Sequence, residues 1–161
     1  MRVESEGFSD PERMDPIGET MDVEFDEGME TITIAECEQL LNSGGVGVLA
    51  LCGTPAPILR PVNFAAYLGQ VVIRTGEGQI LTAAKGSEPA SFVVSGFDRF
   101  EHRGWSVVVS GKLTEQSSLG DLTDLPLRPW VRSGKNRFVA LSITTLSGRR
   151  IATENFSDEA R

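Results

Sequence analysis

Two short segments of the chain combine residue types that suit a bound cofactor. The first is a strand-like run broken by a proline, Arg60-Pro61-Val62-Asn63-Phe64. Because proline cannot donate to a strand ladder, it leaves neighbouring backbone groups free to meet a ligand. The second is Arg74-Thr75, which ends a predicted strand just before two glycines and a predicted helix. A guanidinium, a hydroxyl and the free amides of a helix N-terminus together favour phosphate binding.

A third segment, Trp105-Ser106-Val107, opens a strand of alternating polarity that runs to Gly111-Lys112. Trp105 is either a core residue or a flat wall beside an aromatic ring. Each of the three segments taken alone is more simply explained as structural. Their order within one small domain favours a cofactor site.

Side chains that catalyse reactions without a cofactor are few. The only histidine, His102, lies in a predicted loop and reads as a surface residue. Cys37 falls on the apolar face of a predicted helix and Cys52 ends an apolar strand, so both are predicted to be inert core thiols. There is no nucleophile elbow, P-loop or dinucleotide fingerprint, and the cysteines and histidine are too few to predict a metal site. An enzyme built from this chain would depend on an organic cofactor.

Composition points to one domain with an acidic leader. The chain has 161 residues, of which 40% are hydrophobic and 24% charged. Residues 1–30 hold 11 acidic and 2 basic residues, a net charge of −9, whereas residues 31–161 hold 12 and 13, a net charge of +1. The sequence shows no cluster of basic residues of the kind that binds nucleic acid, so no nucleic-acid partner is expected. No apolar run is long enough for a membrane span or a secretory signal, so the expected location is the cytoplasm.

Three regions are expected along the chain. Residues 1–30 form a leader that is either a loosely packed tail or an arm that docks on a partner, residues 31–154 form the folded domain, and residues 155–161 form a short tail. Order is expected to begin at Thr33, where Thr33 and Glu36 have capping-box spacing. Helices are predicted over 34–42 and 79–85, with a weaker one over 119–125. Strands are predicted over 45–51, 59–67, 71–75, 90–96, 105–114 and 138–144, with an extension over 149–152. These elements predict a mainly β fold, an antiparallel barrel flanked by short helices.

On these residues the sequence resembles the pyridoxamine 5′-phosphate oxidase-like family of FMN-binding split β-barrels, over about residues 34–151. The helix that precedes Gly45-Val46-Gly47 is similar to the family's first helix and strand, and Ser147–Ile151 resembles its closing glycine-arginine segment. The resemblance implies an oxidoreductase that binds FMN as a homodimer, with the site at the subunit interface. The cofactor-binding residues that it implies are Arg60, Pro61, Val62, Asn63, Phe64, Arg74, Thr75, Gln79, Ile80, Trp105, Ser106 and Arg150. It assigns no catalytic residue.

One position departs from the family's pattern. Members commonly carry a lysine at the start of the second helix to neutralise the cofactor phosphate, but here Gln79 and Ile80 stand there, and Lys85 follows one to two turns later. Losing one charge-assisted contact costs roughly 1.5–3 kcal/mol, which is about one or two decades of affinity. FMN is therefore expected to bind weakly and to be absent after purification, unless Arg60 and Arg74 suffice.

Two alternatives stay open at this point. Some relatives of this fold use the 8-hydroxy-5-deazaflavin coenzyme, whose acidic tail would need a basic groove of the kind that Arg99, Arg103 and Lys112 offer. The second alternative is a non-catalytic module that senses haem or a flavin, with the acidic leader as its regulatory element. Trp130 is predicted to cover the subunit interface or the ligand cleft. The small-molecule substrate and the redox partner are not indicated by the sequence.

Overall fold

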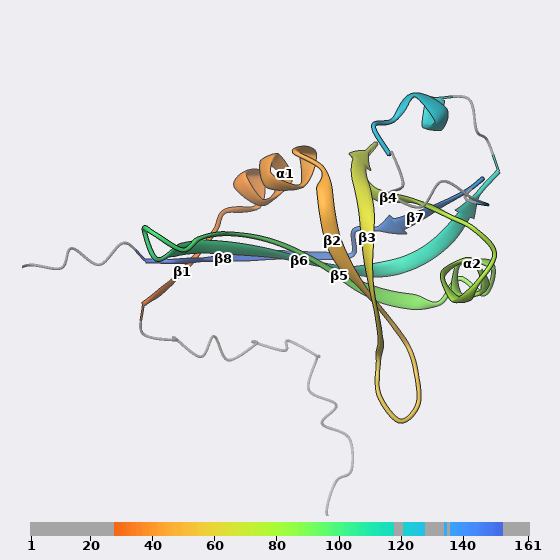
Figure 1. The fold of residues 1–161 in the computed structure, drawn as a ribbon, viewed down its shortest axis with the longest axis horizontal. Coiled ribbons are helices and arrows are strands. Elements are labelled where there is room, and N and C mark those ends of the chain that lie inside the picture. Colours follow the sequence, from red (N-terminus) through yellow and green to blue (C-terminus); the bar gives the residue numbers. More distant parts are fainter. Residues whose placement is uncertain (1–27, 118–120, 128–133, 135, 153–161) are drawn as a thin grey trace, which may run out of the picture.

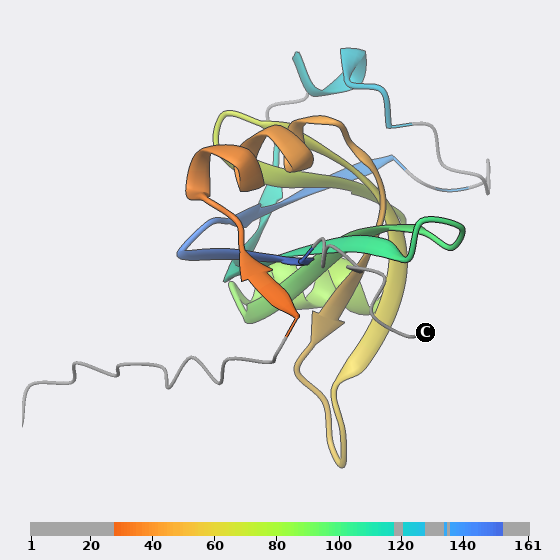
Figure 2. The ribbon, with the colours of Figure 1, turned by 90° about the vertical axis from the view of Figure 1, so that its left-hand side faces the viewer.

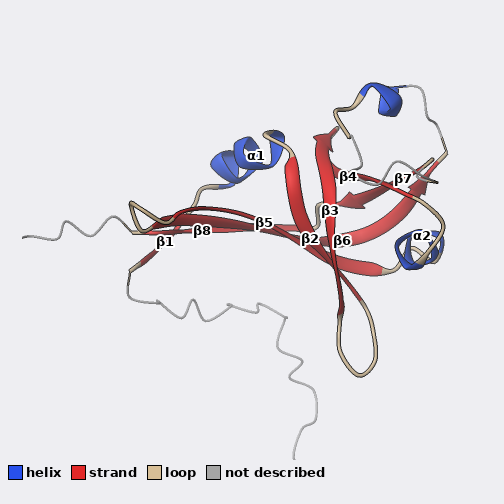
Figure 3. Cartoon of the chain, viewed as in Figure 1, coloured by secondary structure: helices blue, strands red, loops and turns tan. Residues whose placement is uncertain are grey.

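Six antiparallel strands close into a barrel in the computed structural model, which describes residues 28–117, 121–127, 134 and 136–152 (Figure 1). Around the barrel the strands follow the order β6-β5-β2-β3-β4-β7, and β7 pairs with β6 to close the ring. The predicted mainly β barrel with flanking short helices is confirmed (Figure 3). The six strands are β2 (Gly45–Leu51), β3 (Ile58–Tyr67), β4 (Gln70–Thr75), β5 (Pro89–Asp98), β6 (Arg103–Gln116) and β7 (Arg137–Ser142).

The longest strand, β6, serves two separate ladders on the same side. Its first part pairs with β8 (Thr145–Ile151), from Trp105↔Arg150 to Ser110↔Thr145. Its last part, from Leu113 to Gln116, pairs with β7. Gly111 lies between the two ladders, where a Cβ atom would stand 1.8 Å from the backbone oxygen of Ser142. The barrel is therefore split at a point where only glycine lets the strands approach so closely.

Two helices lie at opposite ends of the barrel (Figures 1 and 2). α1 spans Ile34–Asn42 and begins where the Thr33 hydroxyl accepts the Glu36 backbone N–H at 3.3 Å, as its sequence predicted. The Glu36 carboxylate, predicted to complete the capping box, instead pairs with the Arg150 guanidinium of β8. α2 spans Gln79–Lys85 and packs against β6 and β7. The weak third helix predicted over 119–125 is a 3₁₀ helix over Asp121–Asp124.

The core fills the barrel with alternate residues of its strands. Inside, the Phe64 and Phe92 rings meet edge to face with their centroids 4.8 Å apart. A second cluster lies outside the barrel wall, where Leu122 and Leu127 cover Val72 and Phe138. The segment that follows β6 therefore packs onto the outer face of β4 and β7, beside the end of β4.

A short strand, β1 (Met29–Thr31), precedes the capping box, where the sequence predicted none. β1 adds to the free edge of β8, and the Ile32 N–H donates to the Gly148 carbonyl at 2.9 Å. All three β1 residues are exposed, so the sequence has no apolar pattern here that would predict a strand. Residues 1–27 and the predicted 155–161 tail lie outside the described residues, as does Trp130. No helix in the described ranges is long and apolar enough to cross a membrane.

Deleting residues 1–27 should leave the melting temperature within a few degrees of the full chain. Ten of the 27 deleted residues are acidic and two are basic, whereas the β1–β8 ladder is retained. Deleting residues 1–32 should lower the melting temperature by more than about 5 °C, because it removes that ladder together with buried Ile32. Thermal unfolding followed by circular dichroism measures both. A drop of more than several degrees with the shorter deletion would show that the leader packs on the barrel.

Candidate functional site

A pocket of about 170 Å³ opens where β3 and β4 diverge. β4 pairs with β3 only from Phe64↔Ile73 to Tyr67↔Gln70, so residues 58–63 of β3 have β2 as their only ladder partner. Their other edge is free to line the pocket, and the proline predicted to interrupt this strand lies on it. Seven of the twelve predicted cofactor-binding residues line this pocket, together with Leu127: Arg60, Pro61, Val62, Asn63, Arg74, Thr75 and Ile80.

Two arginine side chains line the pocket. Arg60 donates from Nη1 to the Leu59 carbonyl at 3.0 Å and from Nη2 to the Gln79 side-chain oxygen at 2.6 Å, and both acceptors are neutral. Arg74 is half-buried, with its guanidinium carbon 5.7 Å from the centre of the Phe138 ring. None of the described residues that line the pocket is acidic. Two guanidinium groups, with no carboxylate among the described lining residues, make an environment that favours an anion.

Thr75 brings a hydroxyl to the same pocket at the end of β4. Its side chain is 9% exposed, and its Oγ1 donates to the Gly76 carbonyl at a long 3.3 Å. A hydroxyl held this loosely can turn towards a ligand oxygen at little cost. The chain turns immediately after Thr75, through Gly76 and Gly78, so that Ile80 of α2 returns to the pocket.

Gln79, which stands where lysine is common, has a role that its sequence did not reveal. Its amide oxygen accepts the hydrogen bond from Arg60, nineteen positions earlier in the chain. The contact orients the Arg60 guanidinium without offsetting its charge. The departure from the family's pattern therefore exchanges a further cation for a neutral group that positions Arg60. The contact is seen only in the folded chain, where Arg60 of β3 lies beside Gln79 of α2.

Four other predicted residues do not line this pocket. Phe64 is 2% exposed and its ring is in the core, which leaves only its backbone to meet a ligand. Ser106 is half-buried in β6, opposite Ser95 and Arg149. Trp105 and Arg150 line a separate hollow of about 440 Å³ on β6 and β8. In the closed ring β3 stands opposite β6, so one chain does not bring the two sets together.

Aromatic rings form one wall of this second hollow. Trp105 faces Gly96 across the β5–β6 ladder, and a Cβ atom on Gly96 would lie 2.7 Å from the indole nitrogen. Phe97 covers Gly104 in the same way, with a 2.6 Å approach. Trp105 is thus packed on the sheet and also lines the hollow. Sequence reasoning missed Phe97, although the two glycines paired with aromatic residues are a signal of such stacking.

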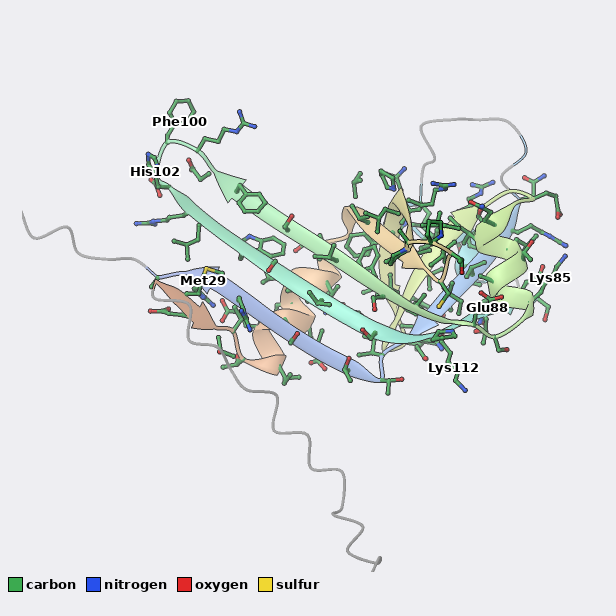
Figure 4. The ribbon with its side chains drawn as sticks, turned by 90° about the horizontal axis from the view of Figure 1, so that it is seen from below. Met29, Lys85, Glu88, Phe100, His102 and Lys112 are labelled. Atoms are coloured by element: carbon green, nitrogen blue, oxygen red, sulfur yellow. The ribbon has the colours of Figure 1, made fainter. Side chains whose placement is uncertain are left out.

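The two cysteines differ in exposure. Cys37 is fully buried, and burial, with a smaller contribution from Glu36, raises the pKa of its thiol. Cys52 was predicted to be a core thiol, which is wrong: it is exposed, because β2 ends at Leu51 and the chain turns outward. His102 is exposed in the β5–β6 turn, as predicted (Figure 4).

The basic groove suggested for a deazaflavin does not form from the residues named for it. Arg103 lies beside the β5–β6 turn, where it pairs with Glu101 at 3.1 Å. Lys112 is nine residues further along β6, on the order of 30 Å away. Figure 4 shows Lys112 at the other end of β6 from His102 and Phe100. Within the described ranges, no three acidic, histidine or cysteine side chains are placed to hold a metal ion.

A closed six-strand barrel whose longest strand serves two ladders is a split β-barrel. The chain belongs to the pyridoxamine 5′-phosphate oxidase family, whose model matches residues 33–150. An uncharacterized protein of Mycobacterium tuberculosis is 31% identical over 127 residues, which cover 74% of this chain and 84% of that protein.

Solved structures share the fold. A FAD-binding protein from Mycobacterium smegmatis is 27% identical, with a TM-score of 0.63 over 75% of this chain and 98% of that one. A putative pyridoxamine 5′-phosphate oxidase from Corynebacterium glutamicum is 22% identical, with a TM-score of 0.64 over 79% and 96%. A second M. smegmatis protein, which binds FAD and haem, is 22% identical, with a TM-score of 0.61 over 83% and 77%.

Proposed function

We propose that this chain is a flavin-dependent oxidoreductase that binds FMN with its phosphate in the pocket of Arg60, Arg74 and Thr75. The observation that carries the proposal is the convergence of two guanidinium groups and a hydroxyl on one pocket, with no acidic residue among the described residues that line it. Family membership supports it, and so does the likeness to the M. smegmatis protein that binds FAD.

The size of the pocket fits the phosphate end of the cofactor. Ligand sites usually span about 300–1,000 Å³, and this pocket measures about 170 Å³. It therefore accommodates the phosphate while the ring lies beyond it. The flavin, when bound, supplies hydride and electron transfer. The chain's own residues hold the phosphate with Arg60, Arg74 and Thr75, while Gln79 fixes Arg60 and Ile80 excludes water.

The proposed site includes a second copy of the chain. Trp105 and Arg150, which the family resemblance assigns to the flavin, lie across the barrel from the phosphate pocket. Two copies are needed if both sets are to contact one ligand. Exposed apolar side chains support an interface: Val46 on β2, Leu59 on β3 and Val108 on β6 are each more than a third exposed.

We expect light scattering coupled to size-exclusion chromatography to give a mass twice the 17.4 kDa of the chain. The physical reason is that the apolar strand faces and the divided site both require a partner. Replacing exposed Leu59 with aspartate should shift the mass towards the monomer and weaken flavin binding together. A mass of 17.4 kDa at micromolar concentration would contradict the dimer and the shared site.

The visible spectrum of the purified protein, before and after incubation with FMN, tests the cofactor. Flavin absorbance retained after desalting supports the proposal, and its bleaching by a nicotinamide hydride donor without oxygen supports oxidoreductase activity. A Soret band or a deazaflavin band would favour the alternatives. For haem at this pocket, the chain's only imidazole, His102, lies in an exposed turn and is not among the lining residues.

A further inference from the structure

One acidic residue belongs to the loop beside the phosphate pocket without lining the pocket. Glu77 follows Thr75 by two residues and precedes Ile80 by three, and both of those residues line the pocket. The loop that carries Glu77 runs from β4 to α2, and β7 lies at the same end of the barrel (Figure 1). The direction of the Glu77 side chain therefore decides whether a negative charge stands beside the two pocket arginines.

Arg137 holds the Glu77 carboxylate at the start of β7. Arg137 is the first residue of that strand and is paired directly with Thr75 across the β4–β7 ladder. Its Nε lies 3.5 Å from a carboxylate oxygen of Glu77 and 3.4 Å from a carboxylate oxygen of Glu115 on β6. Among the ion pairs of the described residues, Glu77 takes part only in the one with Arg137.

The loop itself does little to fix the Glu77 side chain. That side chain is 78% exposed, so packing does not restrain it. Glycines flank it on both sides, and Gly78 has a φ of +151°, a conformation that residues with side chains rarely adopt. Glycine restricts the backbone less than any other residue. The ion pair with Arg137 is therefore the contact that places the charge.

The position of this charge matters more than the strength of the ion pair. An exposed ion pair contributes little to folding, so its loss should leave the fold intact. A carboxylate close to a bound phosphate repels it, and the repulsion falls with distance and with screening by water and salt. On Arg137 the negative charge of Glu77 is offset by a guanidinium. Without Arg137 it would stand two residues from Thr75 with no cation to offset it.

We propose that Arg137 is a positioning residue of the phosphate pocket, which acts by holding the Glu77 carboxylate away from the bound anion. The inference rests on the proposed function, because it takes the Arg60 pocket as the site of the flavin phosphate. Arg137 is not itself among the described residues that line the pocket, so its effect passes through Glu77.

Titrations by flavin fluorescence with FMN and riboflavin test this role in a double-mutant cycle. Arg137→Met keeps the aliphatic stem and removes the charge, and it should weaken FMN roughly three- to tenfold while leaving riboflavin binding unchanged. Glu77→Gln alone should change either affinity by less than about twofold. Arg137→Met combined with Glu77→Gln should regain the FMN affinity of the parent, because no carboxylate then remains in the loop.

Arg137→Met combined with Glu115→Gln is the matched control. Glu115 pairs with the same arginine, but it stands on β6, the second strand from Thr75 in the sheet. This control should bind FMN as weakly as Arg137→Met alone. Arg137→Gln, a second neutral variant, should repeat the loss, so the result does not depend on how one replacement side chain packs.

Three outcomes would overturn the inference while the flavin proposal stands. If Arg137→Met and Arg137→Gln bind FMN like the parent, Glu77 does not need to be held. If Glu77→Gln fails to restore FMN binding to Arg137→Met, Arg137 acts on the phosphate directly. If riboflavin binding falls together with FMN binding, the role of Arg137 is only structural. If the parent binds neither flavin, the proposed function and this inference both fail.

Discussion

Replacing Arg60 or Arg74 with alanine should weaken FMN binding roughly tenfold to a hundredfold while leaving riboflavin binding unchanged. Each arginine is proposed to contribute a charge-assisted contact to the phosphate, worth about 1.5–3 kcal/mol. Riboflavin lacks the phosphate and loses nothing. Fluorescence-quench titrations of the parent and both variants with both flavins measure the difference. Arg99→Ala removes the same charge from an exposed turn and should leave both affinities as they are.

A gain of affinity complements these losses. Ile80 lines the phosphate pocket, so Ile80→Lys should bring an ammonium group to it and tighten FMN by about the same factor. Gln79→Ala should weaken FMN less than Arg60→Ala does, because it frees the Arg60 guanidinium without removing its charge. If both arginine variants bind FMN like the parent and Ile80→Lys gains nothing, the phosphate site lies elsewhere.

Gly111→Ala should destabilise the fold by about 3 kcal/mol or more, which corresponds to a melting temperature lower by about 10 °C. A Cβ atom at this position would stand 1.8 Å from the Ser142 carbonyl oxygen, which belongs to the backbone and cannot rotate away. β7 or β6 would have to shift at the point where the barrel splits. Next to Gly111, the Lys112 N–H donates to the Ser142 hydroxyl at 3.0 Å, which holds the two strands together at this point.

Gly86→Ala is the matched control for this substitution. A Cβ atom on Gly86 would make only ordinary contact with the Glu88 side chain at 3.4 Å, and its φ of −82° suits alanine. The free energy of unfolding of Gly86→Ala should stay within about 0.5 kcal/mol of the parent's. Urea unfolding of the three proteins gives the comparison. Equal stabilities for Gly111→Ala and Gly86→Ala would show that β6 and β7 are farther apart than the structure places them.

Local patterns in the sequence were sufficient for most of the elements. The helices over 34–42 and 79–85 have the bounds that their caps and glycines predicted. β2 was predicted to the residue, because its apolar run ends at a turn. β1 was not predicted, and among the predicted strands the last was the least accurate, because it begins at Thr145 and not at 149. That strand is mostly polar and lies on an outer ladder, where no apolar pattern is required.

For the candidate site, too, the sequence predicted one part and the tertiary structure decided the rest. The sequence by itself predicted a phosphate at Arg74 and Thr75, because residue type and local spacing carry that chemistry, and the family resemblance added Arg60 to that prediction. Only the tertiary structure decided that the β3–β4 ladder stops at Phe64, which opens the pocket, and that Gln79 meets Arg60 across it. It also placed Trp105 on the far side of the barrel. Strand register and barrel closure bring together residues that are distant in the chain, and no local pattern records which ones will meet.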